Sequence, residues 1–247
     1  MLFFRSLFYF PSEEALIYKF RVFIYYMFHA TLALMSNLPH RHLTFWLTLQ
    51  SLFALTLLLL RIGYSGHLFY LFLAWNLVLS MVPYFFAVTL YLRYPRLTGA
   101  ASVILLFFWL LFFPNALYMV TDVIHLRTRD ITPLWADALL LLSFVWTGVL
   151  WGFLSLRLIH EKVVERFGTP YGWGIVVMSM TLGSIGVYLG RFLRWNSWDI
   201  LQEPLGCIAY LLDPLYSPLF SGALWLFTLG YAIFFILAYL VWRGAKE

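Results

Sequence analysis

The chain has few charged residues: Lys, Arg, Asp and Glu together make up 11% of its 247 residues. A soluble domain of ordinary composition has about 25%. Apolar residues account for 63% of the chain, and the mean hydropathy is +0.86. This balance excludes an ordinary soluble enzyme or binding module, and it indicates a membrane protein that crosses the bilayer several times.

Cysteine is almost absent, since Cys207 is the single example. One cysteine excludes a disulfide within the chain, a redox pair and a metal site built from thiolates. The sequence also lacks Gly-x-Ser-x-Gly, a phosphate-binding Gly-Lys-Ser/Thr loop and His-Glu-x-x-His. Because no second His or carboxylate lies at ligand spacing near the candidate residues described below, we expect no bound metal. No particular cofactor is indicated.

Runs of Lys or Arg are also missing, although the net charge is +5. The sixteen Lys and Arg residues lie mostly in short connections between apolar segments. In such places cations orient a protein in the membrane and contact lipid headgroups. We therefore expect membrane lipids, and not nucleic acid, as partners.

Long apolar segments dominate what is present. A spanning helix needs about 20 apolar residues. Six segments approach or exceed that length: 43–60, 67–90, 99–113, 134–158, 173–189 and 218–242. The third is short, and it reaches spanning length if the helix continues through Pro114, which membrane helices tolerate. The sequence therefore predicts an all-α fold, a polytopic transmembrane helix bundle with about six spans.

Residues 1–42 are interpreted as an extension of a transmembrane domain at 43–247. Segment 21–38 within it is either an interfacial helix or a seventh hydrophobic helix. With both termini cytoplasmic, six spans place eleven Lys and Arg residues inside and five outside, whereas a seventh span gives eight and eight. The preference of cations for the cytoplasmic side favours six spans with both termini in the cytoplasm.

The densest polar cluster ends the third apolar segment, at residues 112–126. Asn115, Tyr118, Asp122 and His125 follow one another at steps of three, four and three residues, so in a helix they share one face. An Asp one turn from a His can orient the imidazole and raise its basicity. We predict that Asp122 and His125 are catalytic and that Asn115 and Tyr118 bind substrate. In the alternative, structural interpretation, Asp122 and His125 only satisfy each other, or pair with Arg129, at a helix end in the membrane interface.

A second polar cluster follows the fifth apolar segment. Arg191 and Arg194 share a helical face if that helix continues, and two guanidinium groups suit a phosphate or a carboxylate. Asn196 and Asp199 complete the predicted substrate-binding set. The alternative role of this cluster is to hold the helix end in the lipid headgroup region. In the six-span topology both clusters lie on the outer side, so a joint site is geometrically permitted.

Other residues carry structural expectations. Asn76, inside the second span, is expected to form an interhelical hydrogen bond. Asp137 is expected to pair with Arg127 or Arg129, and residues 160–166 are expected to form a solvated loop. Three glycines of the fifth span predict close helix packing: Gly183, Gly186 and Gly190.

The two clusters together resemble the motifs of an uncharacterised family of bacterial multi-pass membrane proteins. The matching patterns are Pro114-Asn115-Ala116-x-Tyr118-x-x-Thr121-Asp122-x-x-His125-Leu126 and Gly190-Arg191-Phe192-x-Arg194-x-Asn196-Ser197-Trp198-Asp199. The resemblance covers roughly residues 43–242, and Leu117 stands where the family's pattern has a second proline. It implies a bacterial cytoplasmic-membrane protein and implies no activity.

Three functions remain open, and the sequence does not decide whether the chain is an enzyme. The leading hypothesis is an outer-facing site that binds or processes an anionic lipid or lipid-linked substrate, with Arg191 and Arg194 holding the anion. A transporter would need ionisable groups through the middle of the membrane, and most charges lie at segment ends. A structural or assembly subunit of a larger membrane complex would use aromatic residues, 21% of the chain, as contacts with other membrane subunits.

Overall fold

A computed structural model describes residues 40–93, 98–126, 132–195, 202–203, 205–206, 209 and 222–244. The chain divides into two compact units, residues 1–49 and 50–247. The first unit is described only over residues 40–49. Segment 21–38 therefore lies outside the described residues, and the predicted domain boundary at residue 43 stays a prediction.

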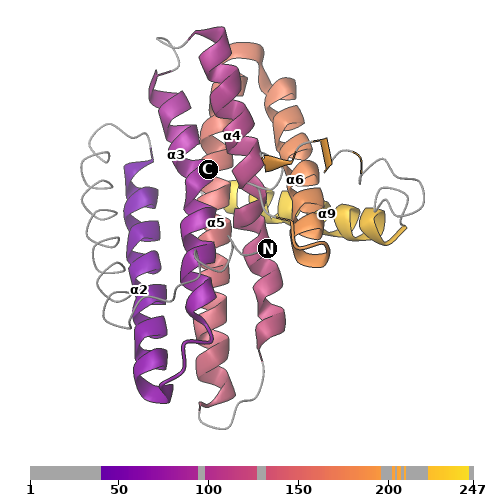
Figure 1. Cartoon of the computed structure of the whole chain (residues 1–247). Coiled ribbons are helices and arrows are strands. Elements are labelled where there is room, and N and C mark those ends of the chain that lie inside the picture. Colours follow the sequence, from indigo (N-terminus) through magenta and orange to yellow (C-terminus); the bar gives the residue numbers. More distant parts are fainter. Residues whose placement is uncertain are drawn as a thin grey trace. The chain divides into compact units, whose positions relative to one another are not determined.

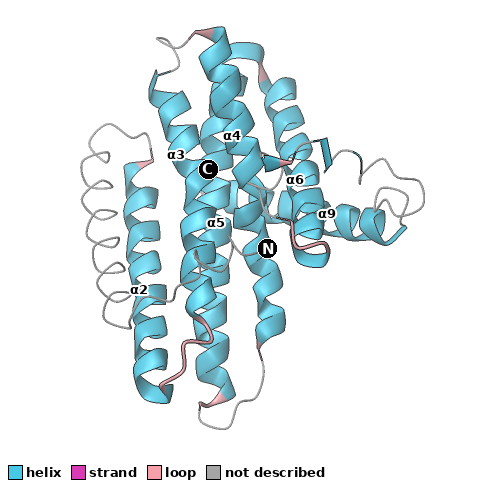
Figure 2. Ribbon diagram, in the orientation of Figure 1, coloured by secondary structure: helices cyan, strands magenta, loops and turns pink. Residues whose placement is uncertain are grey.

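The described residues form helices joined by short connections (Figure 2). In chain order they are α2 (Arg41–Ser65), α3 (Leu71–Arg93), α4 (Gly99–Tyr118), η2 (Met119–His125), α5 (Leu134–Phe167), α6 (Thr169–Phe192) and α9 (Gly222–Gly244); the α-helices are labelled in Figure 1. Counting α4 and η2 as one segment, six of these are long and apolar enough to cross a membrane. The predicted all-α fold with about six spans is confirmed, and it indicates a multi-pass membrane protein.

The third span continues through Pro114, as predicted, and changes its winding near its end. The α-helix ends at Tyr118, and a 3₁₀-helix continues over Met119–His125. A 3₁₀-helix has about three residues per turn, so side chains three positions apart eclipse one another. Asp122 and His125 are therefore stacked on one side of η2.

Helix α5 is longer than predicted. It runs for 34 residues to Phe167, so the expected loop at 160–166 is wrong. Two ion pairs on its last turns support the extension, Arg157 with Glu161 and Lys162 with Glu165, because such pairs at helical spacing stabilise a helix. The helix ends at Gly168, whose φ of 96° suits glycine.

The second half of α4 packs closely against α6, because glycines face it there. A Cβ on Gly186 would lie 2.6 Å from the Cγ of Pro114, and one on Gly183 would lie 2.8 Å from a Leu117 methyl carbon. A Cβ on Gly190 would lie 3.4 Å from the Tyr118 ring, which is ordinary van der Waals contact. The predicted close packing of these glycines is confirmed. Small residues allow helix backbones in a membrane to approach and gain van der Waals contact.

Glycines on α5 contact the end of α4 and the start of η2 on the side away from α6. A Cβ on Gly152 would lie 2.7 Å from the Ala116 Cβ, and one on Gly148 would overlap the thioether of Met119. The end of α4 and the start of η2 are therefore packed between α5 and α6 with almost no lateral freedom. This packing fixes the direction of the polar side chains that η2 carries.

A buried ion pair joins α2 to α5 at the end of the bundle where η2 also ends. Arg61 Nε lies 2.6 Å from Asp137 Oδ1, and the two side chains are 8% and 1% exposed. The hydroxyl groups of Tyr70 and Thr132 both donate to Asp137 Oδ2, at 3.3 Å. The expected partners Arg127 and Arg129 lie outside the described residues, and the partner found for Asp137 is Arg61 instead.

The glycine contacts give the first prediction. Gly186→Ala is expected to lower the free energy of unfolding by about 1–3 kcal/mol, because the proline ring opposite is rigid and cannot yield to a new methyl group. Unfolding in mixed detergent micelles would measure this. Gly174→Ala is the matched control on the same helix, since a Cβ there meets nothing within 4 Å. Equal stability of the two variants would contradict the packing described.

The Asp137 ion pair gives the second prediction. Asp137→Ala leaves the Arg61 guanidinium buried without its carboxylate, so the same assay should show a loss of about 3–5 kcal/mol. The double variant Arg61→Met/Asp137→Leu should recover most of that loss, because both charges leave together. As a control, Glu165→Ala removes an exposed pair and should cost at most about 1 kcal/mol. If the double variant does not recover stability, the loss caused by Asp137→Ala comes from packing and not from the unpaired charge.

Candidate functional site

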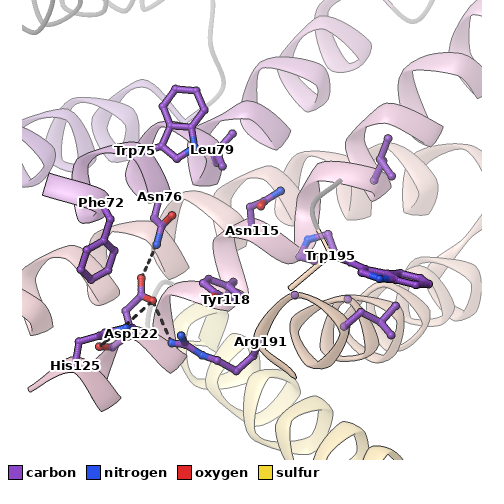
Figure 3. Close-up of a pocket in the computed structure, with 15 residues that line it drawn as sticks. Phe72, Trp75, Asn76, Leu79, Asn115, Tyr118, Asp122, His125, Arg191 and Trp195 are labelled. Atoms are coloured by element: carbon purple, nitrogen blue, oxygen red, sulfur yellow. Dashed lines mark hydrogen bonds and ion pairs between the residues drawn. The ribbon is translucent and has the colours of Figure 1, made fainter. Parts of the chain in front are cut away.

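A polar pocket lies where α3 begins and where η2 and α6 end (Figure 3). Its volume is about 320 Å³, and it is lined mainly by residues of α3, α4, η2 and α6. The polar and charged side chains around it are Asn76, Asn115, Tyr118, Asp122, His125 and Arg191. Trp75 and Trp195 also line the pocket and give it apolar walls. Four residues of the first predicted cluster thus face the same cavity as Arg191 of the second.

Asp122 is the centre of the hydrogen-bond network at this pocket. Its side chain is 1% exposed, and two other helices supply donors to its carboxylate. Asn76 Nδ2 donates to Oδ2 at 2.8 Å, and Arg191 Nη2 donates to Oδ1 at 3.2 Å. A buried carboxylate is costly unless it is paired and hydrogen-bonded, and here both conditions are met. Asp122 thereby joins α3, η2 and α6.

Arg191 makes three contacts that fix its guanidinium group. Besides Asp122, its Nη2 donates to the backbone carbonyl of Thr121. The guanidinium carbon lies 4.8 Å from the centroid of the Tyr118 ring, within the range of a cation–π contact. Its Nε is buried and has no hydrogen-bond partner among the described residues. The arginine is therefore held in place with one N–H group still unsatisfied.

His125 is oriented by the backbone and not by the carboxylate. Its Nδ1 lies 3.1 Å from the Asp122 carbonyl oxygen but 4.0 Å from Asp122 Oδ1, which is too long for a hydrogen bond. A carbonyl oxygen only accepts, so Nδ1 carries the proton and Nε2 of the neutral ring is an acceptor. The side chain is 31% exposed, so this imidazole can meet a ligand.

Arg194 does not share a face with Arg191. Helix α6 ends at Phe192, and Arg194 follows with a φ of 59°, in the left-handed region. The Trp195 N–H then turns back to the Leu189 carbonyl oxygen at 3.3 Å. This turn carries Arg194 to an exposed position that does not line the pocket. The condition for a shared face, a continuing helix, is not met.

The remaining predicted site residues divide into two groups. Asn115 lines the pocket, and its Nδ2 donates to the Phe112 carbonyl oxygen at 2.9 Å. Tyr118 also lines it. Asn196 and Asp199 lie outside the described residues, so their predicted roles stay predictions.

Asn76 is the residue whose importance sequence reasoning underestimated. We expected an interhelical hydrogen bond, and its partner is the Asp122 carboxylate itself. The available signal was an amide alone within an apolar span, which indicates a buried polar partner without identifying it. Phe72, whose ring centroid lies 4.9 Å from that of His125, gave no signal because aromatic residues are frequent in this chain.

The arrangement can bind a polar group and exchange a proton with it. His125 offers an exposed imidazole, Asn115 and Tyr118 line the cavity, and the Asp122–Arg191 pair supplies a fixed dipole at its base. Among the described residues, no group of three or more His, Cys, Asp or Glu side chains could hold a metal ion. The described side chains of the pocket are suited to acid–base and hydrogen-bonding chemistry.

Comparison with known proteins places the chain in a family. Residues 75–238 match the family described as protein of unknown function (DUF1361), and the match includes both polar clusters. No curated protein and no solved structure matches the chain. Because the match spans more than half of the 247 residues, the protein belongs to the DUF1361 family of unknown function.

Proposed function

We propose that the pocket is an outer-facing site for an anionic lipid or lipid-linked substrate. The site either binds this substrate only or also processes it. The observation that carries this proposal is a polar cavity built around the buried Asp122–Arg191 pair at one end of an otherwise apolar helix bundle. Polar and ionisable groups are costly within a membrane protein, and they cluster where they serve a ligand.

The charges around the pocket favour an anion. Asp122 and Arg191 neutralise each other, so the negative charge of the carboxylate is already compensated. Arg194 adds an exposed positive charge three residues after Arg191. An entering phosphate or carboxylate would therefore meet this positive charge together with the Tyr118 hydroxyl and the Asn115 amide.

In a processing reaction His125 would be the base, through Nε2. Asp122 would have a positioning role. Its carboxylate would hold Arg191 in place, and its backbone carbonyl, in η2, would orient His125. Asn196 and Asp199 would extend the binding surface beyond Arg194. A transporter is less well supported, because Trp109, Phe113 and Leu117 are each 0% exposed and fill the bundle beside the pocket.

The proposal includes an orientation. We infer a bacterial cytoplasmic-membrane protein with both termini in the cytoplasm and the pocket at the outer surface. Three features support this: the six spans, the excess of Lys and Arg on the side opposite the pocket, and the resemblance to a bacterial family.

Ligand binding gives the third prediction. In nanodiscs, an anionic phospholipid with a photoreactive headgroup is expected to cross-link to the peptides at 111–126 and 186–195. His125→Gln combined with Arg194→Gln should reduce that cross-linking at least about fivefold, since the Arg194 cation near the headgroup contributes about 1 kcal/mol. Peptide mapping by mass spectrometry measures the yield.

The control for this experiment is His67→Gln, because His67 is exposed at the same end of the bundle and does not line the pocket. Its cross-linking should equal that of the unchanged protein. Equal yields for a zwitterionic phospholipid, or no cross-link to either peptide, would refute the proposed site.

Orientation gives the fourth prediction. With Cys207 replaced by Ser, His67→Cys and Tyr171→Cys place single thiols at exposed positions on opposite ends of the bundle. A membrane-impermeant maleimide added to intact cells is expected to label His67→Cys, and to label Tyr171→Cys only after permeabilisation. The reverse pattern would place the pocket on the cytoplasmic side.

A further inference from the structure

A second pocket lies at the end of the bundle opposite the candidate site, where α3 ends, α4 begins and α5 ends. Its volume is about 500 Å³. Two cationic side chains line it, Lys162 and Arg166, and most of its other walls are apolar. We propose that this pocket is a specific binding site for one anionic phospholipid, independent of the function proposed above.

Lys162 lines the pocket, and its ammonium group has two defined neighbours. Its side chain is only 17% exposed, and Nζ lies 4.5 Å from the centroid of the Tyr91 ring. A cation over an aromatic face is attracted to it, so the ammonium group keeps its position without a carboxylate. Arg166 follows four residues later and therefore lies on the same face of α5.

The carboxylate that contacts Lys162 can be displaced. Glu165 Oε2 lies 2.7 Å from Nζ, but the glutamate side chain is 68% exposed. An exposed ion pair of this kind contributes little, because water screens it and a long side chain must be ordered. A lipid phosphate, with several acceptor oxygens, would replace the glutamate at the ammonium group.

The neighbouring charges leave this end of α5 positive. Glu161 is paired with Arg157, with 2.7 Å between Arg157 Nε and Glu161 Oε1. Three cations and two anions lie on the last turns of the helix: Arg157, Lys162, Arg166, Glu161 and Glu165. An anionic headgroup is therefore favoured over a zwitterionic one, whose own cation would be repelled.

The depth of the pocket fits a lipid headgroup above an acyl chain. Lys162 lies five residues before the end of α5 at Phe167, which is about 8 Å along the axis. The apolar wall continues toward the membrane interior along Leu106 and Ile159. Val103 borders it and is 69% exposed, so the groove is open to the bilayer on its lipid side. One acyl chain can lie there while the phosphate contacts the two cations.

Native mass spectrometry tests this proposal on the full-length protein released from micelles. Phosphatidylglycerol is compared with phosphatidylcholine of identical acyl chains. The unchanged protein should prefer phosphatidylglycerol, and Lys162→Gln/Arg166→Gln should lower the affinity for one bound molecule of it about 30-fold, or fivefold per cation. Val103→Trp, which fills the groove and keeps the charges, should weaken binding of that lipid as well.

Arg93→Gln is the matched control, because Arg93 is an exposed cation at the same end that does not line the pocket. It should bind phosphatidylglycerol like the unchanged protein. An equal loss with Arg93→Gln would show a diffuse basic surface and overturn the proposal. Displacement of the lipid by inorganic phosphate, or unchanged binding in the double variant, would overturn it too.

Discussion

The hydrogen-bonded ion pair between Asp122 and Arg191 is the interaction on which the candidate site depends. A carboxylate that is 1% exposed would be untenable alone, and its donors come from two other spans. Removing any one donor leaves a buried group unsatisfied, which costs more than the net gain of forming the bond. The carboxylate therefore determines which ends of α3, η2 and α6 meet, and the pocket forms where they meet.

Close packing makes that convergence possible. Glycines on α5 and α6 face Ala116, Pro114 and Leu117, so the end of the third span is enclosed by two neighbours at near-backbone distance. In lipid, such contact is a principal attraction between helices, because the surrounding solvent is as apolar as the side chains. The same packing holds η2 as a 3₁₀-helix whose polar side faces the cavity. Packing thus sets the position of the site, and the ion pair sets its charge.

The described charged side chains gather toward the two ends of the bundle, and α5 connects the ends. Near its first residues, Asp137 pairs with Arg61 and accepts from Tyr70, whose hydroxyl also lies 3.4 Å from the His125 carbonyl oxygen. Near its last residues, the helix carries the cations of the second pocket. Between them it is the most buried span, with 78% of its most apolar window inside the protein. One long helix, α5, therefore extends from the end of the bundle with the candidate site to the end with the second pocket. The ligands proposed for these two pockets would lie on opposite sides of the membrane.

The sequence by itself determined the all-α fold, the number of spans and the face that Asn115, Tyr118, Asp122 and His125 share. These features depend on local periodicity, because an apolar segment in lipid must satisfy its backbone within itself and so forms a helix. Only the tertiary structure decided that Asn76 and Arg191 meet Asp122, and that Asp137 meets Arg61. Those partners lie 46, 69 and 76 positions apart in the chain, where no local pattern specifies a contact. The left-handed turn at Arg194 could not be predicted from the sequence either. Residues other than glycine seldom adopt a positive φ, and no local sequence signal indicates that the helix ends before Arg194.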